Sequence, residues 1–366
     1  MRVVAAPDSF KGSITAAAAA AALAAGWRQV RPGDEVIELP LADGGEGTLA
    51  VLAAAVPASR WHSADVCGPG TARVSAAWLE IPGNGAVIEL AAAAGLPQLA
   101  ELIPLDAHSY GVGELISHAL DAEARQIVVA LGGSASTDGG TGALAALGAR
   151  FLDSAGRELP RGGGALRRLA EVDLSGLRPP PAGGVSCLTD VRAPLLGPEG
   201  AAAVFGPQKG AGPAEVSALD AGLARLAGLL GGDPAAPGAG AAGGCGYGLA
   251  AAWSAQLLSG AAEIAAIAGL PQLLTDADLV ITGEGRYDVT SLGGKVVGAV
   301  CTAAASMGVP MAIVAGQLAA PPPDGVRVVE LAVLADSVQA AVAEPSRWLT
   351  AAGRLLATAT SSRDDG

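Results

Sequence analysis

Several residue types are scarce in this chain, and each scarcity excludes a class of protein. The 366 residues include four cysteines and three histidines, and only 3% are aromatic. The cysteines (Cys67, Cys187, Cys245 and Cys301) show no C-x-x-C spacing, and the histidines form no cluster. Neither a disulfide framework nor a zinc site is indicated, and we expect the protein in a reducing, cytoplasmic compartment.

Basic residues are also few. Lys plus Arg total 22 against 35 Asp plus Glu, which gives a formal net charge of −13. Long-range attraction to nucleic acid or to an anionic membrane surface is therefore not expected. A small anionic ligand would need cations placed locally.

Long, strongly apolar runs are missing too. The alanine run Ala16–Ala22 superficially resembles a signal peptide, but Asp8 and Lys11 interrupt the segment. No window approaches the roughly 20 apolar residues of a membrane span, so we expect no membrane association. We predict a strand over Val3–Ala6 and then an alanine-rich helix that ends near Trp27.

Short apolar runs alternate with longer helical stretches, and 51% of the residues are hydrophobic. This pattern indicates an α/β protein with a largely parallel sheet covered by helices. The predicted strands are Val3–Ala6, Val36–Leu39, Val74–Leu79, Ala86–Leu90, Ile127–Leu131, Val185–Thr189, Leu279–Thr282, Met311–Val314 and Val326–Leu331. Nearly all are followed by a glycine-containing loop, and such loops at the carboxyl ends of strands form the ligand crevice in α/β sheets.

Lysine is the scarcest basic residue and its positions are informative. The three lysines, Lys11, Lys209 and Lys295, each adjoin a glycine, while arginine supplies the other positive charges. A lysine ammonium is a point charge on a flexible stem that suits a phosphate oxygen. We expect these lysines to contact an anionic ligand; the alternative is three solvated lysines near turns.

Carboxylates follow several of the predicted strands. They are Asp8, Asp43, Glu46, Asp138, Asp190, Glu284 and Asp288. Carboxylates beside glycine-bared backbone amides suit Mg²⁺ and phosphate. For a single loop, helix capping is an equal alternative, because Asp43 and Glu46 could simply begin a helix over Glu46–Val56.

Standard nucleotide and hydrolase motifs are absent. No G-x-x-x-x-G-K-[ST] loop and no G-x-S-x-G elbow occur. Residues Gly238–Gly243 fit G-x-G-x-x-G, but they follow a Gly/Pro-rich stretch rather than a strand. We predict Gly231–Gly248 to be a mobile loop or chain crossing whose small residues let the backbone approach another backbone or a nucleotide.

Five blocks, in order along nearly the whole chain, together resemble the bacterial glycerate kinase family that forms 2-phosphoglycerate. They are APDSFK (Ala6–Lys11), ADGGEGT (Ala42–Thr48), the glycine loop Gly132–Gly140, FGPQKGA (Phe205–Ala211), and ITGEGR (Ile281–Arg286) with Asp288 and Lys295. The resemblance implies an ATP- and Mg²⁺-dependent kinase of D-glycerate. It also implies a flavodoxin-like parallel sheet interrupted by a restriction-endonuclease-like, mixed-sheet α/β domain.

The implied domains are residues 1–59 with 275–366, and an insertion over 60–274, with the active site in the cleft between them. The first, second and last three predicted strands would form the flavodoxin-like sheet. Asp8, Asp43, Glu284 and Lys295 would then meet at one sheet edge. Whether the chain is a monomer or a homodimer stays open.

The resemblance also suggests roles for individual residues. Predicted catalytic residues are Asp8, Lys11, Asp190 and Lys209, with Asp8 or Asp190 as the base. Predicted metal ligands are Asp43 and Asp190. Predicted substrate and phosphate contacts are Ser9, Asp43, Gly44, Gly45, Glu46, Ser134, Asp138, Glu284, Arg286, Asp288 and Lys295, with Arg286 on the substrate carboxylate.

The expected reaction is phosphorylation of D-glycerate at its 2-hydroxyl, giving 2-phosphoglycerate and ADP. Alternatives are a 3-kinase, a kinase of a related small hydroxy acid, a small-acid-binding regulatory protein, and a nicotinamide-dependent oxidoreductase that would use Gly238–Gly243. Glycerate and a nucleotide are the expected partners.

Overall fold

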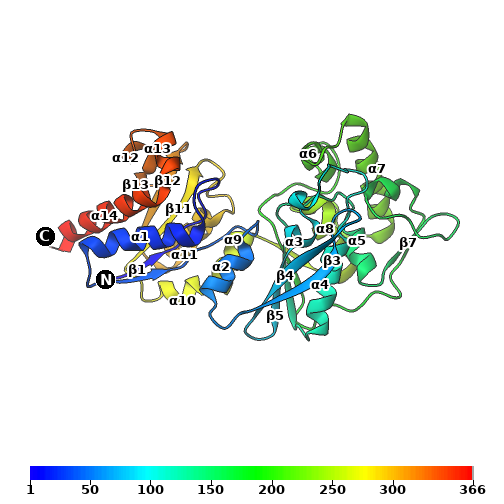
Figure 1. Cartoon of the computed structure of the whole chain (residues 1–366), viewed down its shortest axis with the longest axis horizontal. Coiled ribbons are helices and arrows are strands. Elements are labelled where there is room, and N and C mark those ends of the chain that lie inside the picture. The colour runs from blue at the N-terminus through cyan, green and yellow to red at the C-terminus, as the bar shows by residue number, and fades with distance from the viewer. Residues whose placement is uncertain (365–366) are drawn as a thin grey trace. The chain divides into compact units, whose positions relative to one another are not determined.

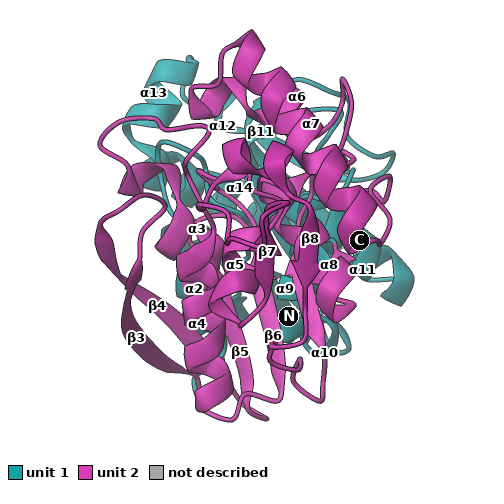
Figure 2. Cartoon of the chain, turned by 90° about the vertical axis from the view of Figure 1, so that its right-hand side faces the viewer, with its two compact units in different colours: residues 1–43, 50–57, 259–366 teal, residues 44–49, 58–258 magenta. Residues whose placement is uncertain are grey.

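The structure is a computed structural model that describes residues 1–364, and its chain divides into two compact units (Figures 1 and 2). Unit 1 contains residues 1–43, 50–57 and those from Ser259 onward, and unit 2 contains residues 44–49 and 58–258. The boundaries predicted from sequence are 59/60 and 274/275. In the structure the second crossing comes earlier, because helices α9 and α10 pack against α11 within unit 1.

Unit 1 is built on a five-stranded sheet in which every neighbouring pair is parallel. Its strands are β1 (Arg2–Ala5), β2 (Glu35–Glu38), β11 (Leu279–Tyr287), β12 (Met311–Leu318) and β13 (Arg327–Glu330). The spatial order β2-β1-β11-β12-β13 is 2-1-3-4-5 when the strands are numbered within the sheet, which is the flavodoxin-like order. The predicted fold class and all five predicted strands of this sheet are confirmed.

Helices cover both faces of this sheet. They are α1 (Ala16–Val30), α2 (Thr48–Ala55), α9 (Gly260–Ile267), α10 (Leu270–Leu274), α11 (Val296–Met307), α12 (Leu331–Leu334), α13 (Val338–Ala343) and α14 (Pro345–Asp364). The Thr15 side chain caps α1 by accepting a hydrogen bond from the Ala18 amide, and the alanines that follow favour the helix.

Helices α1 and α14 lie side by side in unit 1 (Figure 1). Two glycines permit this contact. A Cβ atom on Gly26 would lie 2.0 Å from the Thr350 carbonyl oxygen, and one on Gly353 would lie 2.3 Å from that of Leu23. Each helix therefore presents a bare backbone where the other crosses it.

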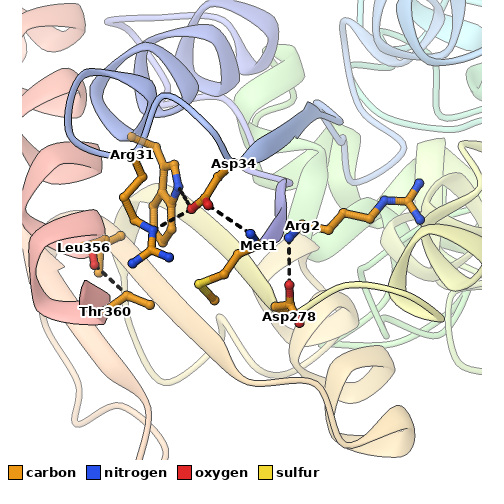
Figure 3. Close-up of polar contacts among 8 residues, drawn as sticks. Met1, Arg2, Arg31, Asp34, Asp278, Leu356 and Thr360 are labelled. Carbon is orange, nitrogen blue, oxygen red and sulfur yellow. Dashed lines mark hydrogen bonds and ion pairs between the residues drawn. The ribbon is translucent and has the colours of Figure 1, made fainter. Parts of the chain in front are cut away.

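The start of β1 is fixed by two carboxylates (Figure 3). Asp34 accepts hydrogen bonds from the Met1 amino group at 2.9 Å, from Trp27 Nε1 at 2.9 Å and from Arg31 Nε at 2.7 Å. The Arg2 amide donates to Asp278 at 2.7 Å. These bonds tie β1 to the end of α1 and to the start of β11, so the central strand is held at its amino end.

Unit 2 contains a six-stranded mixed sheet of order β10-β9-β6-β5-β4-β3. Its strands are β3 (Arg60–Cys67), β4 (Arg73–Ile81), β5 (Gly85–Glu89), β6 (Gln126–Ala130), β9 (Val185–Leu188) and β10 (Gln256–Leu258), and β7 (Arg150–Leu152) and β8 (Glu171–Asp173) form a separate pair. The four predicted strands of this unit are confirmed. The sequence did not predict the two edge strands or the small pair, because edge strand β3 alternates exposed and half-buried polar residues along most of its length.

The helices of unit 2 include short 3₁₀ turns. They are α3 (Leu90–Ala94), η1 (Leu96–Gln98), α4 (Tyr110–Asp121), α5 (Thr141–Ala146), η2 (Gly163–Arg168), α6 (Ala201–Phe205), η3 (Pro207–Lys209), α7 (Pro213–Leu230), η4 (Ala241–Gly244) and α8 (Cys245–Trp253). With the sheet they enclose an apolar core that includes Ile88, Leu115 and Tyr247. Over residues 1–364, no helix combines the length and apolar character needed to cross a bilayer.

The glycine-rich run Gly231–Gly248 is more ordered than the sequence predicts. It contains η4 and the first turns of α8. A Cβ atom on Gly243 would lie 2.1 Å from the Ser136 carbonyl oxygen, so glycine is needed here for close backbone contact. Residues Gly238–Gly243 follow α7 and a loop rather than a strand, so the structural context of a dinucleotide fingerprint is missing.

Candidate active site

A pocket of about 290 Å³ opens in unit 1 beside the carboxyl ends of β1 and β11. In a flavodoxin-like sheet this is the topological switch point, where the strand order reverses and ligands bind. Eight predicted site residues line it: Asp8, Ser9, Lys11, Asp43, Glu284, Arg286, Asp288 and Lys295. Asp8, Asp43, Glu284 and Lys295, the four residues expected to meet at one sheet edge, all line this pocket.

Asp8 follows β1 and lines the pocket, where it is half-buried. Its amide donates to the Gly283 carbonyl at 2.8 Å, which fixes the chain beside β11, and its carboxylate accepts the Ser9 amide at 2.6 Å. Burial raises the pKa of the Asp8 carboxyl to about 6, and the negative charges of Asp43 and Glu284 add to this. Asp8 can therefore exchange a proton near neutral pH, which suits a general base.

Lys11 and Asp43 form the open rim of the pocket. The Lys11 side chain is 85% exposed, and its Nζ lies 4.0 Å from Asp43 Oδ2. An exposed pair at this distance contributes little to stability. Lys11 is thus free to turn toward a ligand phosphate or carboxylate.

Glu284 is held inside strand β11, and this corrects one prediction. The Gly283–Asp288 segment was expected to be a loop after Thr282, but β11 pairs with β12 as far as Tyr287. The extension is possible because Gly283 and Gly316 bring the backbones of β11 and β12 close together, where a Cβ atom would lie 2.2–2.3 Å from a carbonyl oxygen.

The Glu284 carboxylate is buried and only partly satisfied. Among the described residues its Oε1 atom has no hydrogen-bond partner, and burial raises the pKa of this carboxyl. Lys295 Nζ lies 3.9 Å from Glu284 Oε2 and 3.8 Å from Asp288 Oδ1. An orphaned carboxylate oxygen beside a lysine fits a site completed by a ligand or a cation.

The loop Gly44–Glu46 groups with unit 2, and its helix begins later than predicted. Helix α2 starts at Thr48 rather than Glu46, and Glu46 is exposed. The amide donors at this helix start are taken by Glu89 at the end of β5, which accepts the Leu49 amide at 2.8 Å. Burial raises the pKa of Glu89, while hydrogen bonds from the amides of residues 47–49 lower it. Glu89 is not among the residues predicted from the sequence, although it is another acid that closes a strand.

Three other predicted site residues meet in a buried polar cluster of unit 2. Lys209 is 3% exposed; its Nζ donates to Ser136 O at 2.5 Å and to Ser134 Oγ at 3.3 Å. Asp138, fully buried, accepts the Ser109 amide at 2.8 Å and the Ser109 hydroxyl at 2.9 Å. Burial lowers the pKa of Lys209 to about 8, although Asp138 raises it.

Asp190 is half-buried and follows β9 after Thr189, so it does end a strand, as predicted. It belongs to unit 2, whereas Asp43, the other predicted metal ligand, belongs to unit 1.

The unit 1 pocket holds four carboxylates and three cations from the lining residues named above. Across residues 1–364, no three His, Cys, Asp or Glu side chains are grouped closely enough to hold a metal by themselves. Mg²⁺ in nucleotide sites commonly takes only one or two carboxylates and completes its shell with phosphates and water. Asp8, Asp43 and Glu284 offer oxygen ligands of that kind.

A model of the glycerate kinase family matches residues 3–361 of the chain. The chain belongs to the glycerate kinase family. It is therefore a kinase, with a nucleotide as the phosphate donor. Glycerate 2-kinase of Escherichia coli (strain K12) is 41% identical to it over 336 residues, covering 87% of this chain and 86% of that protein.

Two further relatives agree with this assignment. Glycerate kinase of Bacillus subtilis (strain 168) is 42% identical over 334 residues, covering 87% of this chain and 85% of that protein. A solved structure from Salmonella typhimurium LT2, described as a glycerate kinase 2, has a TM-score of 0.87 and 40% identity, and both chains are covered completely. The kinase has the same fold as that structure over its whole length. Both sheets described above therefore also occur in that relative.

Proposed function

We propose that the kinase transfers the γ-phosphoryl group of ATP to the 2-hydroxyl of D-glycerate, in a reaction that requires Mg²⁺. The observation that supports this most is the pocket at the switch point of the unit 1 sheet, where Asp8 has its pKa raised to about 6 beside Lys11 and Lys295. Phosphoryl transfer to an alcohol needs a general base whose pKa is near neutral and cations that bind the transferred phosphate.

Asp8 would accept the proton of the attacking hydroxyl. It is half-buried, and it is fixed through its own amide to Gly283 and through its carboxylate to the Ser9 amide. Its raised pKa makes it a stronger base than an ordinary aspartate while leaving most of it ionised at neutral pH. Asp190 stays the alternative base predicted from sequence.

The anionic groups of the two substrates would be bound by three cations, Lys295, Lys11 and Arg286. Lys295 sits between Glu284 and Asp288 and keeps its ammonium in the pocket, and Lys11 can swing in from the rim. Arg286 can bind the glycerate carboxylate through two parallel hydrogen bonds. Lys209 stays a predicted catalytic residue, and its side chain is buried in unit 2.

Mg²⁺ would be held by Asp43 with Glu284, and Asp190 stays the second ligand predicted from sequence. The orphaned Glu284 Oε1 atom fits a cation at this site. So do the negative charges of Asp43 and Glu284, which add to the effect of burial in raising the pKa of Asp8. When bound, Mg²⁺ would neutralise phosphate charge and orient the donor.

The test is ADP release measured with the full chain, ATP and D-glycerate. We expect release that depends on both D-glycerate and Mg²⁺ and is stopped by EDTA. Release with another hydroxy acid in place of D-glycerate would identify a related kinase. No release with any acceptor, alongside binding of the acid, would favour the small-acid-binding alternative.

A further inference from the structure

One wall of the unit 1 pocket is apolar, and the reaction proposed above gives it no role. Leu331 at the start of α12, Val338, Ala341 and Val342 on α13, and Pro345 at the start of α14 line it. Leu331 and Ala341 are buried, whereas Val338 and Val342 are 38% and 52% exposed. Two β-branched apolar side chains thus face the solvent inside a pocket whose other wall is charged.

The two walls define the chemistry of the ligand that would cover both. The charged wall carries Lys11, Arg286 and Lys295 and suits an anionic group. The apolar wall suits a flat or aliphatic group that gains free energy by leaving water. Glycerate is a small, fully polar acid, so it cannot cover the apolar wall. A nucleotide has phosphates at one end and an apolar, planar base at the other.

Gln317 adds a polar group beside the apolar wall. It lines the same pocket and is the register partner of Arg286 across β11 and β12. The Gln317 side chain is half-buried. Its amide offers one acceptor and two donors, which is the complement that the hydrogen-bonding edge of a base requires.

We propose that Val338, Val342 and Pro345 form the subsite for the base of the nucleotide donor, with Gln317 hydrogen-bonded to the edge of that base. The inference rests on the proposed function, since it assumes that a nucleotide binds in this pocket. It fixes the direction of the donor: base toward α13 and phosphates toward Lys11 and Lys295. Glycerate would then take the Asp8 and Arg286 side.

Val342→Asp and Val338→Asp test the subsite, with Val333→Asp as the matched control. Val333 is 68% exposed on the neighbouring α12 and does not line the pocket. The readout is the Kd of Mg-ATP, measured by calorimetry with the full chain and no glycerate. We expect Kd to rise by about tenfold or more in each pocket variant, because an apolar contact with the base is replaced by a charged group that must lose water when the base binds. The control should stay within twofold.

The preference of the kinase for one nucleobase over another gives a second readout. Gln317→Ala should lower the preference between ATP and GTP, measured as the ratio of their Kd values, by several-fold. The KM for glycerate in the Val342→Asp protein should change less than twofold, because that substrate lies at the other wall.

The outcomes separate the inference from the proposed function. Unchanged Mg-ATP affinity in both pocket variants, or no nucleotide binding by the wild type, would overturn the base subsite. A changed oligomeric state in Val342→Asp with unchanged affinity would show that a second copy covers this wall and would also overturn it. Tight nucleotide binding that is weakened as expected, but without ADP release with glycerate, would uphold the subsite and reject the glycerate kinase activity.

Discussion

Asp8 is the base in the proposed mechanism, and its environment costs folding stability. The folded-state pKa, about 6, exceeds the ordinary value of 3.8, so the folded protein binds this proton more tightly than the unfolded chain does. Stability therefore falls as pH rises from about 4 to 6 and stays reduced above that range. Burial is the main cause of this cost, and the negative charges of Asp43 and Glu284 add to it, so a bound cation would offset part of it.

Asp8→Asn should accordingly stabilise the protein at neutral pH in the absence of Mg²⁺. The expected gain in the free energy of unfolding is up to about 3 kcal/mol near pH 7.5 and close to zero near pH 4. Urea unfolding at both pH values measures this, with the exposed Asp324→Asn as the control. A less stable Asp8→Asn protein at pH 7.5 would show that the carboxylate is stabilised by contacts rather than strained.

Lys209 and Lys295 should respond differently to the same substitution. Lys209→Met removes the ammonium that donates to Ser134 Oγ and to the Ser136 carbonyl, which leaves two buried acceptors without this donor, and we expect a loss of about 1–3 kcal/mol in the free energy of unfolding. Lys295 is 34% exposed, so Lys295→Met should cost less than about 1 kcal/mol. Denaturant unfolding of the two variants decides this, and equal losses would contradict the assignment.

Turnover of the same Lys295→Met protein tests its place at the transferred phosphate. We expect kcat to fall by about a hundredfold or more, because a preorganised positive charge is lost where negative charge develops. Steady-state ADP release measures it, and a kcat within threefold of wild type would remove Lys295 from the site.

Residues such as Asp8 and Lys295 could be predicted because they directly follow apolar strands or adjoin glycines. Gln317 and Glu89 could not. Gln317 comes from the extended end of β12, and Glu89 acts on a helix start forty residues earlier in the chain. Their roles depend on which strands and loops become neighbours, and a single sequence does not reveal that.

At the scale of elements, β11 shows why the sequence underestimates a strand. Its second half, Gly283-Glu284-Gly285-Arg286-Tyr287, has little intrinsic strand preference. Pairing with β12 outweighs this weak preference. The pairing is possible because Gly283 and Gly316 have no side chains where the two backbones lie close together. The strand positions Glu284 and Arg286 more rigidly than a loop would.

The start of α2 depends on an acid from β5. Glu89→Ala removes the acceptor of the Leu49 amide, and we expect a loss of about 1–3 kcal/mol in the free energy of unfolding, with a smaller loss for Glu89→Gln. The control is Glu46→Gln, an exposed acid in the same loop, which should not lower stability. Equal stability of Glu89→Ala and wild type would mean that α2 needs no cap from β5.

Packing between α1 and α14 depends on glycine at their crossing. Gly353→Ala would bring a Cβ atom to 2.3 Å from the Leu23 carbonyl oxygen, so we expect a loss of about 1–3 kcal/mol. Gly33→Ala is the control, because nothing lies within 4 Å of its Cβ position. Thermal unfolding of both proteins measures the difference, and an unshifted Tm for Gly353→Ala would mean that the helices separate easily.

At the scale of the whole molecule, the order of the strands is encoded in widely separated segments. β1 pairs with β11, more than two hundred residues later, through the register Val3 with Leu279. The family resemblance predicted this interrupted sheet; composition and periodicity alone would have predicted only an α/β protein. The edge strands of unit 2 were missed because their exposed sides lack the apolar pattern of buried strands.

The central claim is that the kinase phosphorylates the 2-hydroxyl of D-glycerate. Proton-coupled ³¹P NMR of the product formed from ATP, Mg²⁺ and D-glycerate tests it directly, because phosphate on C2 couples to one carbon-bound proton and phosphate on C3 couples to two. The account predicts a doublet that matches added 2-phosphoglycerate. A triplet that matches 3-phosphoglycerate would contradict it.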